Sequence, residues 1–320
     1  MQDASCSSST GGAATASCHP ALVAALSKVL SLSRKLAAQQ HSSSLAQIEN
    51  LKHVCFAASL PPVDAPLPRP LIDKLMQQLA ETGGPHTGVA LSAFKLAIQA
   101  GSIPITARAR QAALHPGFIE AVAAFATKSP ADAFTRMAAA ATLALLAHAC
   151  DEARRGVVMQ GDVTVDLMLS CLQKASDASA ADGELGSSRC DQLLMLSVLS
   201  VFKEAGGARA ERATGDAHAL RVAAQLCDPS YAKTGVGRGP ALLYLSDAFA
   251  PPRGRMSEAE WLDRPPWQPP PEAGPLLEQL FPQFASLLLG PDVPRDARLG
   301  LLALVYRLLR MPGSSRGAAV

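Results

Sequence analysis

The chain has 320 residues, of which 48% are hydrophobic, 18% charged and only 4% aromatic, and its formal net charge is +2. This composition excludes wholesale disorder. The near-neutral charge excludes a general electrostatic attraction to nucleic acid or to anionic membranes. With so few aromatic residues the interior must be filled by Leu, Ala, Val and Met, a mixture that favours packed helices over sheets. We therefore expect an all-α protein.

The N-terminal residues 1–19 are rich in Ser, Thr, Ala and Gly and are predicted to form a disordered leader. They lack the basic start and apolar core of a secretory signal. Their Ser-rich composition leaves an organelle transit peptide open as the alternative.

The seven cysteines are scattered, without the dense spacing of a disulfide scaffold, and this indicates a reducing compartment. The predicted location is the cytoplasm.

Apolar helical stretches then follow one another in pairs, each pair joined by a polar or Gly/Pro-bearing turn. The first halves begin near Ala21, Leu71, Gly117, Val163, Ala217 and Pro275, and the second halves at Ser44, Gly88, Ala131, Cys190, Pro240 and Arg295. One hairpin alone cannot bury both of its apolar faces, whereas stacked hairpins can. The pattern predicts about six stacked helix pairs, which occupy residues 20–250 and 275–311.

Three segments interrupt or end the regular succession of helix pairs. Residues 177–188 are predicted to be a loop insertion, residues 251–274 a Pro-rich loop, and residues 312–320 a disordered tail.

The uncharged run at residues 137–150 raises the question of a membrane span. It is shorter than the roughly 20 apolar residues that a bilayer requires, so we expect a helix of the stack and no membrane span.

The middle of the chain resembles armadillo repeats. Residues 151–161 look like the short first helix and glycine of a repeat, residues 163–172 like its second helix, and residues 136–148 like the third helix of the preceding repeat. Residues 106–122 show the same pattern of a short helix, a glycine and a second helix, with Gly117 in the place of Gly161. A third copy of the pattern has Gly215 in that place. The resemblance runs from about residue 71 to residue 226; outside it, HEAT-like pairs remain an alternative. It implies a right-handed α-solenoid.

The resemblance also implies that the alanine-rich helices line a concave binding surface. Peptide-binding members of the family carry a Trp and an Asn there that clamp an extended peptide. The corresponding positions here are Thr142 and Leu146, and Ala93 and Ala97 in the preceding unit. The clamp is therefore absent, which argues against a nuclear-import receptor.

Motifs for metal, cofactor or catalysis are weak. No close Cys-x-x-Cys or His-x-x-x-His pair suggests zinc, and the nearest approximation, His148 and Cys150, is interpreted as buried or incidental. The glycine-rich residues 235–239 lack the Lys-Ser/Thr ending of a phosphate loop and are interpreted as a flexible loop. No Ser or Cys has the local context of an activated nucleophile. We expect no cofactor, no metal and no enzymatic activity.

Two sets of residues are candidates for partner binding. In the Pro-rich loop, Pro266 and Pro269 have the minimal PxxP spacing, with Trp261 and Trp267 as aromatic anchors; the alternative is a loop that packs back on the helices. The second set comprises Lys95, Arg136, Lys203, Arg298, Arg307 and Arg310. These form a cationic stripe if the pairs stack in register, or else are ordinary solvated positions.

These observations predict a non-catalytic scaffold or adaptor that binds a protein partner through its concave groove or its Pro-rich loop. The alternative is a helical-repeat RNA-binding protein, possibly organellar, for which a continuous basic groove is the requirement. A third interpretation is an accessory portion of a larger protein.

Overall fold

The structure is a computed structural model. It describes residues 20–38, 44–59, 65–99, 107–128, 132–178, 189–205, 207–227 and 239–248, together with the helical residues 295, 298, 299, 301, 302 and 305. These residues form helices and no strand, which confirms the all-α prediction for this part of the chain. The helices are α1 (Pro20–Ala38), α2 (Ser44–Ser59), α3 (Arg69–Glu81), α4 (Pro85–Gln99), α5 (Ala107–Ala113), α6 (Phe118–Lys128), α7 (Ala133–Ala147), α8 (Asp151–Met159), α9 (Asp162–Ala178), α10 (Arg189–Ala205), α11 (Gly207–Gly215), α12 (Ala217–Leu226) and α13 (Gly239–Ala248).

The first five predicted pairs correspond to α1/α2, α3/α4, α6/α7, α9/α10 and α12/α13. The short helices α5, α8 and α11 precede the last three pairs. Helix α9 runs to Ala178, so it includes the first two residues of the predicted loop 177–188. The Pro-rich loop, the tail and most of the predicted sixth pair lie outside the described residues.

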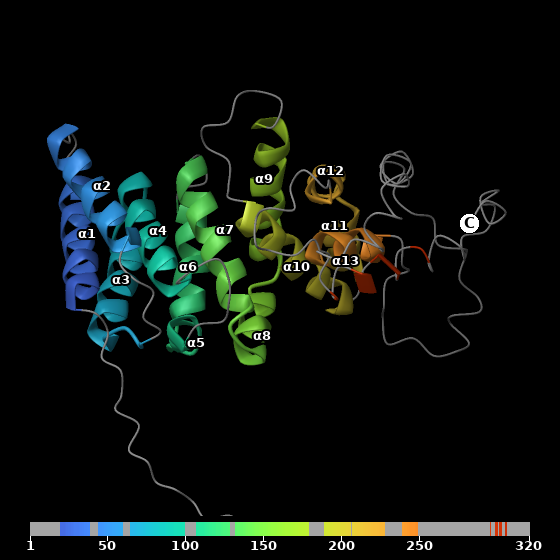
Figure 1. Ribbon diagram of the computed structural model, residues 1–320, viewed down its shortest axis with the longest axis horizontal. Coiled ribbons are helices and arrows are strands. Elements are labelled where there is room, and N and C mark those ends of the chain that lie inside the picture. The colour runs from blue at the N-terminus through green and yellow to red at the C-terminus, as the bar shows by residue number, and fades with distance from the viewer. Residues whose placement is uncertain are drawn as a thin grey trace, which may run out of the picture.

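The helices stack in consecutive layers, arranged in a row from α1 to α13 (Figure 1). Helices α4, α7, α10 and α13 pack each against the next, and so do α3, α6, α9 and α12. Each layer thus covers the apolar faces that the previous layer leaves open.

Helix α7 is the most enclosed element of the row. Residues 138–147 are all buried, and the helix packs against α4, α5, α6, α8, α9 and α10. Small side chains permit this crowding: a Cβ atom on Gly88 of α4 would lie only 3.2 Å from the ring of Phe134 on α7. The uncharged run at residues 137–150 is thus core. In the described part of the chain, no helix is sufficiently long and apolar to cross a bilayer.

The expectation that the clamp positions line an open surface is wrong. Thr142 is 1% exposed and Leu146 is fully buried, and Ala93 and Ala97 on α4 are buried as well. Thr142 donates its hydroxyl to the carbonyl of Ala138 one turn earlier in the helix. The alanine-rich sequence of α7 reflects close packing on several sides, because only small side chains fit where neighbouring layers meet.

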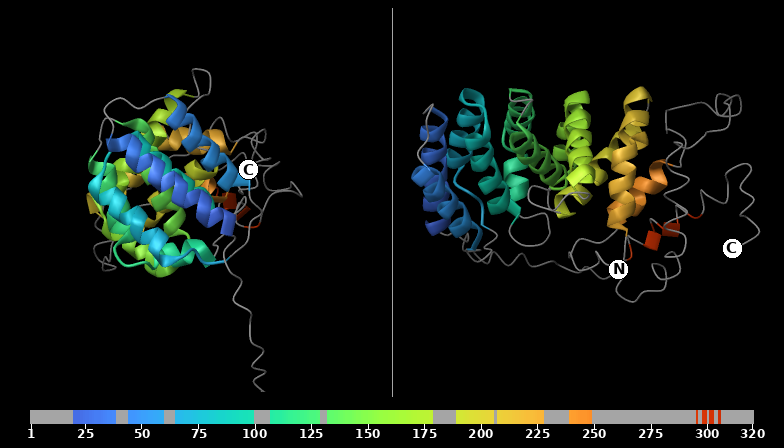
Figure 2. Two further views of the ribbon diagram at one scale, coloured as in Figure 1. Left: turned by 90° about the vertical axis from the view of Figure 1, so that its left-hand side faces the viewer. Right: turned by 90° about the horizontal axis from the view of Figure 1, so that it is seen from above.

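The first helix pair departs from the register of the later ones. Helix α1 packs on α2 and α4 and also on α3, while α2 packs on α1 and α4. In the end-on view α1 lies between α2 and α3 (Figure 2). This arrangement leaves one side of α2 without a neighbouring described helix.

The turns that precede α6, α9 and α12 have two different geometries. Gly117 and Gly161 have φ values of 75° and 64°, in the left-handed region that favours glycine, as their corresponding positions in the repeat suggest. Gly215 instead ends α11, and Asp216 caps α12 by accepting the backbone N–H groups of His218 and Ala219 at 3.0 and 2.9 Å. The third copy therefore resembles the others in sequence but not in turn geometry.

Candidate partner-binding site

Lys95 does not contribute a free charge to a cationic stripe. Its Nζ lies 2.5 Å from Oδ1 of Asp191 on α10, and the two side chains are only 10% and 8% exposed. Next to this pair, the Gln99 amide donates to Sγ of Cys190 at 3.6 Å. The sequence-based assignment of Lys95 to an exposed surface is thus corrected, because a buried lysine requires a neutralising partner.

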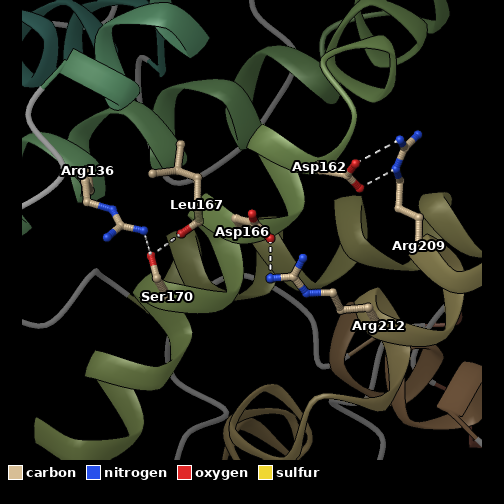
Figure 3. A network of polar contacts seen from close by, with 7 residues as sticks. All are labelled: Arg136, Asp162, Asp166, Leu167, Ser170, Arg209 and Arg212. Atoms are coloured by element: carbon tan, nitrogen blue, oxygen red, sulfur yellow. Dashed lines mark hydrogen bonds and ion pairs between the residues drawn. The ribbon is translucent and has the colours of Figure 1, made fainter.

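Two other members of the predicted stripe are partly sequestered. Arg136 is half-buried at the start of α7 and donates to Oγ of Ser170 on α9 at 2.6 Å, and Ser170 donates in turn to the Leu167 carbonyl at 2.9 Å (Figure 3). Arg298 is half-buried on a helical segment.

The remaining candidates fall beyond what the structure describes. Lys203 belongs to α10, but its side chain is outside the described part, as are Arg307 and Arg310. Trp261, Pro266, Trp267 and Pro269 also lie outside the described residues. The proposed Pro-rich docking segment therefore stays a prediction.

An exposed ion-pair ladder joins α9 to α11 (Figure 3). Arg209 donates from Nε and Nη2 to the two carboxylate oxygens of Asp162, at 2.7 and 3.2 Å. One turn further along, Arg212 lies 2.5 Å from Oδ1 of Asp166. The hydrogen bonds from Arg209 hold the pKa of Asp162 below its usual range. The ladder links two successive layers and uses charges that would otherwise be available to a partner.

Sequence analysis missed this ladder, although a signal exists. Asp162 and Asp166 are four residues apart, and Arg209 and Arg212 are three apart, so each pair lies on one face of its helix. Only the stacking of α9 against α11 brings the two faces together.

His148, Cys171 and Cys190 lie within the stacked helices. His148 contacts the Ala144 carbonyl through Nδ1 at 2.8 Å and Oγ of Ser197 on α10 through Nε2 at 3.0 Å. Burial raises the pKa of the Cys171 thiol to about 11 and also raises that of Cys190. Within the described ranges, no group of three His, Cys, Asp or Glu side chains is placed to hold a metal ion.

Large apolar side chains are exposed at several places along the described helices, and three of them lie on α2 and α4. Leu51 and Phe56 of α2 are 53% and 48% exposed, and Leu96 of α4, the helix against which α2 packs, is 43% exposed. We call these three residues the α2–α4 surface. Exposed apolar side chains that form one contiguous patch are the kind of surface that protein partners cover.

Comparisons with known proteins add no assignment: no family model, curated protein or solved structure matches the chain.

Proposed function

We propose that the chain is a right-handed, armadillo-like α-solenoid that serves as a non-catalytic scaffold or adaptor in the cytoplasm. Support comes from the stacking of α4, α7, α10 and α13 on one side of the row and of α3, α6, α9 and α12 on the other. The glycine turns at Gly117 and Gly161 follow the short helices α5 and α8, as in the family that the sequence resembles. A row of stacked layers offers a long surface relative to its core.

The observation that carries the scaffold proposal is the α2–α4 surface. Leu96 lies on α4, most of which is buried, and Leu51 lies on α2, which packs on α1 and α4; both side chains remain exposed outside these contacts. An apolar segment of a protein partner would remove these side chains from water, which favours association. The partner is thus proposed to bind at the α1 end of the row.

The RNA-binding alternative has less support. It needs cations that converge on one groove. Lys95 is instead neutralised by Asp191, and Arg136 is engaged with Ser170.

The test is an affinity purification with mass spectrometry that compares the wild-type chain with the double variant L51E/L96E. The control is L114E/M159E, which places the same charges at Leu114 and Met159, exposed by 52% and 83% at the ends of α5 and α8. Circular dichroism checks that all three proteins are equally helical.

We expect a protein partner that is lost with L51E/L96E and retained with L114E/M159E. A partner retained by both variants but lost when residues 251–274 are replaced by a Gly/Ser linker would locate binding in the Pro-rich loop instead. Enrichment of RNA, with no protein, would favour the alternative function.

A further inference from the structure

Residues 65–68, which precede α3, form a short non-helical segment that is bound to α5 by hydrogen bonds. Their side chains alternate: Ala65 and Leu67 are 0% and 2% exposed, whereas Pro66 and Pro68 are exposed. A period of two is that of an extended chain with one face buried. Pro68 itself is extended, with φ of −58° and ψ of 126°. We call these four residues the strap.

Gln111 of α5 binds the strap through both backbone groups of one residue. The Leu67 N–H donates to Oε1 of Gln111 at 2.8 Å, and Nε2 of Gln111 donates to the Leu67 carbonyl at 2.7 Å. Two residues of adjacent antiparallel strands exchange hydrogen bonds in the same way. Grooves that hold an extended peptide also rely on such backbone bonds for affinity.

Arg108 binds the strap two residues upstream of Leu67. Its Nε donates to the Ala65 carbonyl at 2.6 Å, and its Nη1 donates to the carbonyl of Ala97 on α4 at 2.9 Å. Arg108 is 2% exposed, and no carboxylate of the described residues pairs with it. A buried guanidinium needs acceptors, so a backbone carbonyl has to occupy the position that Ala65 provides. We call Arg108 and Gln111 the strap site.

The prolines of the strap simplify its hydrogen bonding. Pro66 and Pro68 have no N–H group, so Leu67 carries the only backbone donor of these three residues, and Gln111 already accepts from it. Another extended segment with the same proline spacing would therefore fit the strap site without leaving a backbone donor unpaired.

We propose that the strap site is a peptide-binding site that the chain fills with its own strap. A partner protein binds there through an extended segment with the pattern small residue, Pro, Leu, Pro, which takes the place of the strap. Each backbone hydrogen bond of the strap is replaced by an equivalent bond of the partner segment. Leu67 belongs to the hydrophobic core, so its position selects an aliphatic side chain.

The strap competes with the partner segment because it belongs to the same chain. Its effective concentration at the strap site is high, and this lowers the apparent affinity for a segment added in solution. Weakening the strap should therefore strengthen partner binding. The strap site lies on α5, apart from the α2–α4 surface, and the inference does not depend on the scaffold function.

The test is fluorescence anisotropy with a labelled peptide, Ala-Pro-Leu-Pro-Arg-Pro, which has the sequence of residues 65–70. The variant L67A weakens the strap and keeps Arg108 and Gln111. We expect the full chain with L67A to bind the peptide at least about tenfold more tightly than wild type does. The matched control is L75A, which truncates a leucine of α3 that is also fully buried, and it should bind the peptide as wild type does.

The double variant L67A/Q111L tests the recognition of the backbone. We expect it to bind the peptide at least about tenfold more weakly than L67A does, because the amide that pairs with the leucine backbone is lost. The proposal is overturned if L67A binds no better than wild type, if L75A gains as much as L67A, or if Q111L leaves the affinity of L67A unchanged.

Hydrogen exchange in the wild-type chain tests the replacement of the strap without any substitution. Since the neighbouring prolines have no N–H, the Leu67 amide signal reports on the strap alone. With saturating unlabelled peptide we expect the Leu67 N–H to exchange at least about tenfold faster, while the amides of α7 keep their protection. Unchanged protection of Leu67 while the peptide is bound would place the peptide elsewhere and overturn the proposal.

Discussion

Lys95 of α4 and Asp191 of α10 form a buried ion pair between residues 96 positions apart in the sequence. Both helices pack against α7, so the pair ties together the layers on either side of the most enclosed helix. A charge pair at this place is costly to desolvate, and its contribution to the stability of the fold depends on both partners being present.

Replacing Lys95 with Met should lower the free energy of unfolding by about 3 to 5 kcal/mol, because Asp191 is left as a buried charge without its cation. The double variant K95M/D191L should recover most of this loss. Urea unfolding of the wild type, both single variants and the double variant gives the coupling energy directly. A K95M protein as stable as wild type would show that solvent reaches the pair.

The helices themselves were largely predictable from the sequence. Apolar periodicity and turn residues located α3, α4, α9 and α10 closely, because these features act within a single helix. The short helices α5 and α8 followed from the armadillo resemblance. The predicted glycine correspondence held for Gly117 and Gly161, where the backbone requires a left-handed residue.

The candidate site was less predictable, because it depends on which helix faces meet. From the sequence, Lys95 was expected on an exposed surface, but in the fold it pairs with Asp191 of α10. Thr142 was expected to line an open groove, but the helices that pack against α7 bury it. In each case the relevant partner comes from another layer of the stack.

Gly161 should be sensitive to substitution for two reasons. Its φ of 64° disfavours any side chain, and a Cβ atom would lie 3.3 Å from Nη2 of Arg209. We expect G161A to cost about 1 to 2 kcal/mol for the backbone conformation alone, and somewhat more for the displaced arginine. Thermal or urea unfolding measures the loss.

The matched control is G84A, since Gly84 has a φ of 88° but nothing within 4 Å of its Cβ position. The double variant G161A/R209A should remove the steric part of the effect. If G161A and G84A lose the same stability, contact with Arg209 is unimportant.

The ladder between α9 and α11 predicts a shift in the titration of Asp162. Its pKa is held low mainly by the hydrogen bonds from Arg209, so R209Q should raise the pKa of Asp162 toward its usual value. Because the folded pKa is depressed, the pair stabilises the fold above the unfolded pKa and loses its effect as pH falls through the folded pKa. Carboxyl chemical shifts followed by NMR report the titration, with R221Q on α12 as the control; an unshifted Asp162 in R209Q would contradict the assignment.

His148 predicts a pH dependence of stability near neutrality. Burial lowers the pKa of His148, the Ala144 carbonyl opposes this shift, and the charge of Arg154 adds to it. The unfolded chain therefore binds a proton at higher pH than the folded protein does, and stability should fall as pH drops through the ordinary range of histidine. In H148Q the free energy of unfolding should depend less on pH between about 7 and 5. The control H86Q, in the first turn of α4, should retain the wild-type slope; the same slope in H148Q and wild type would show that the proton is taken up equally in both states.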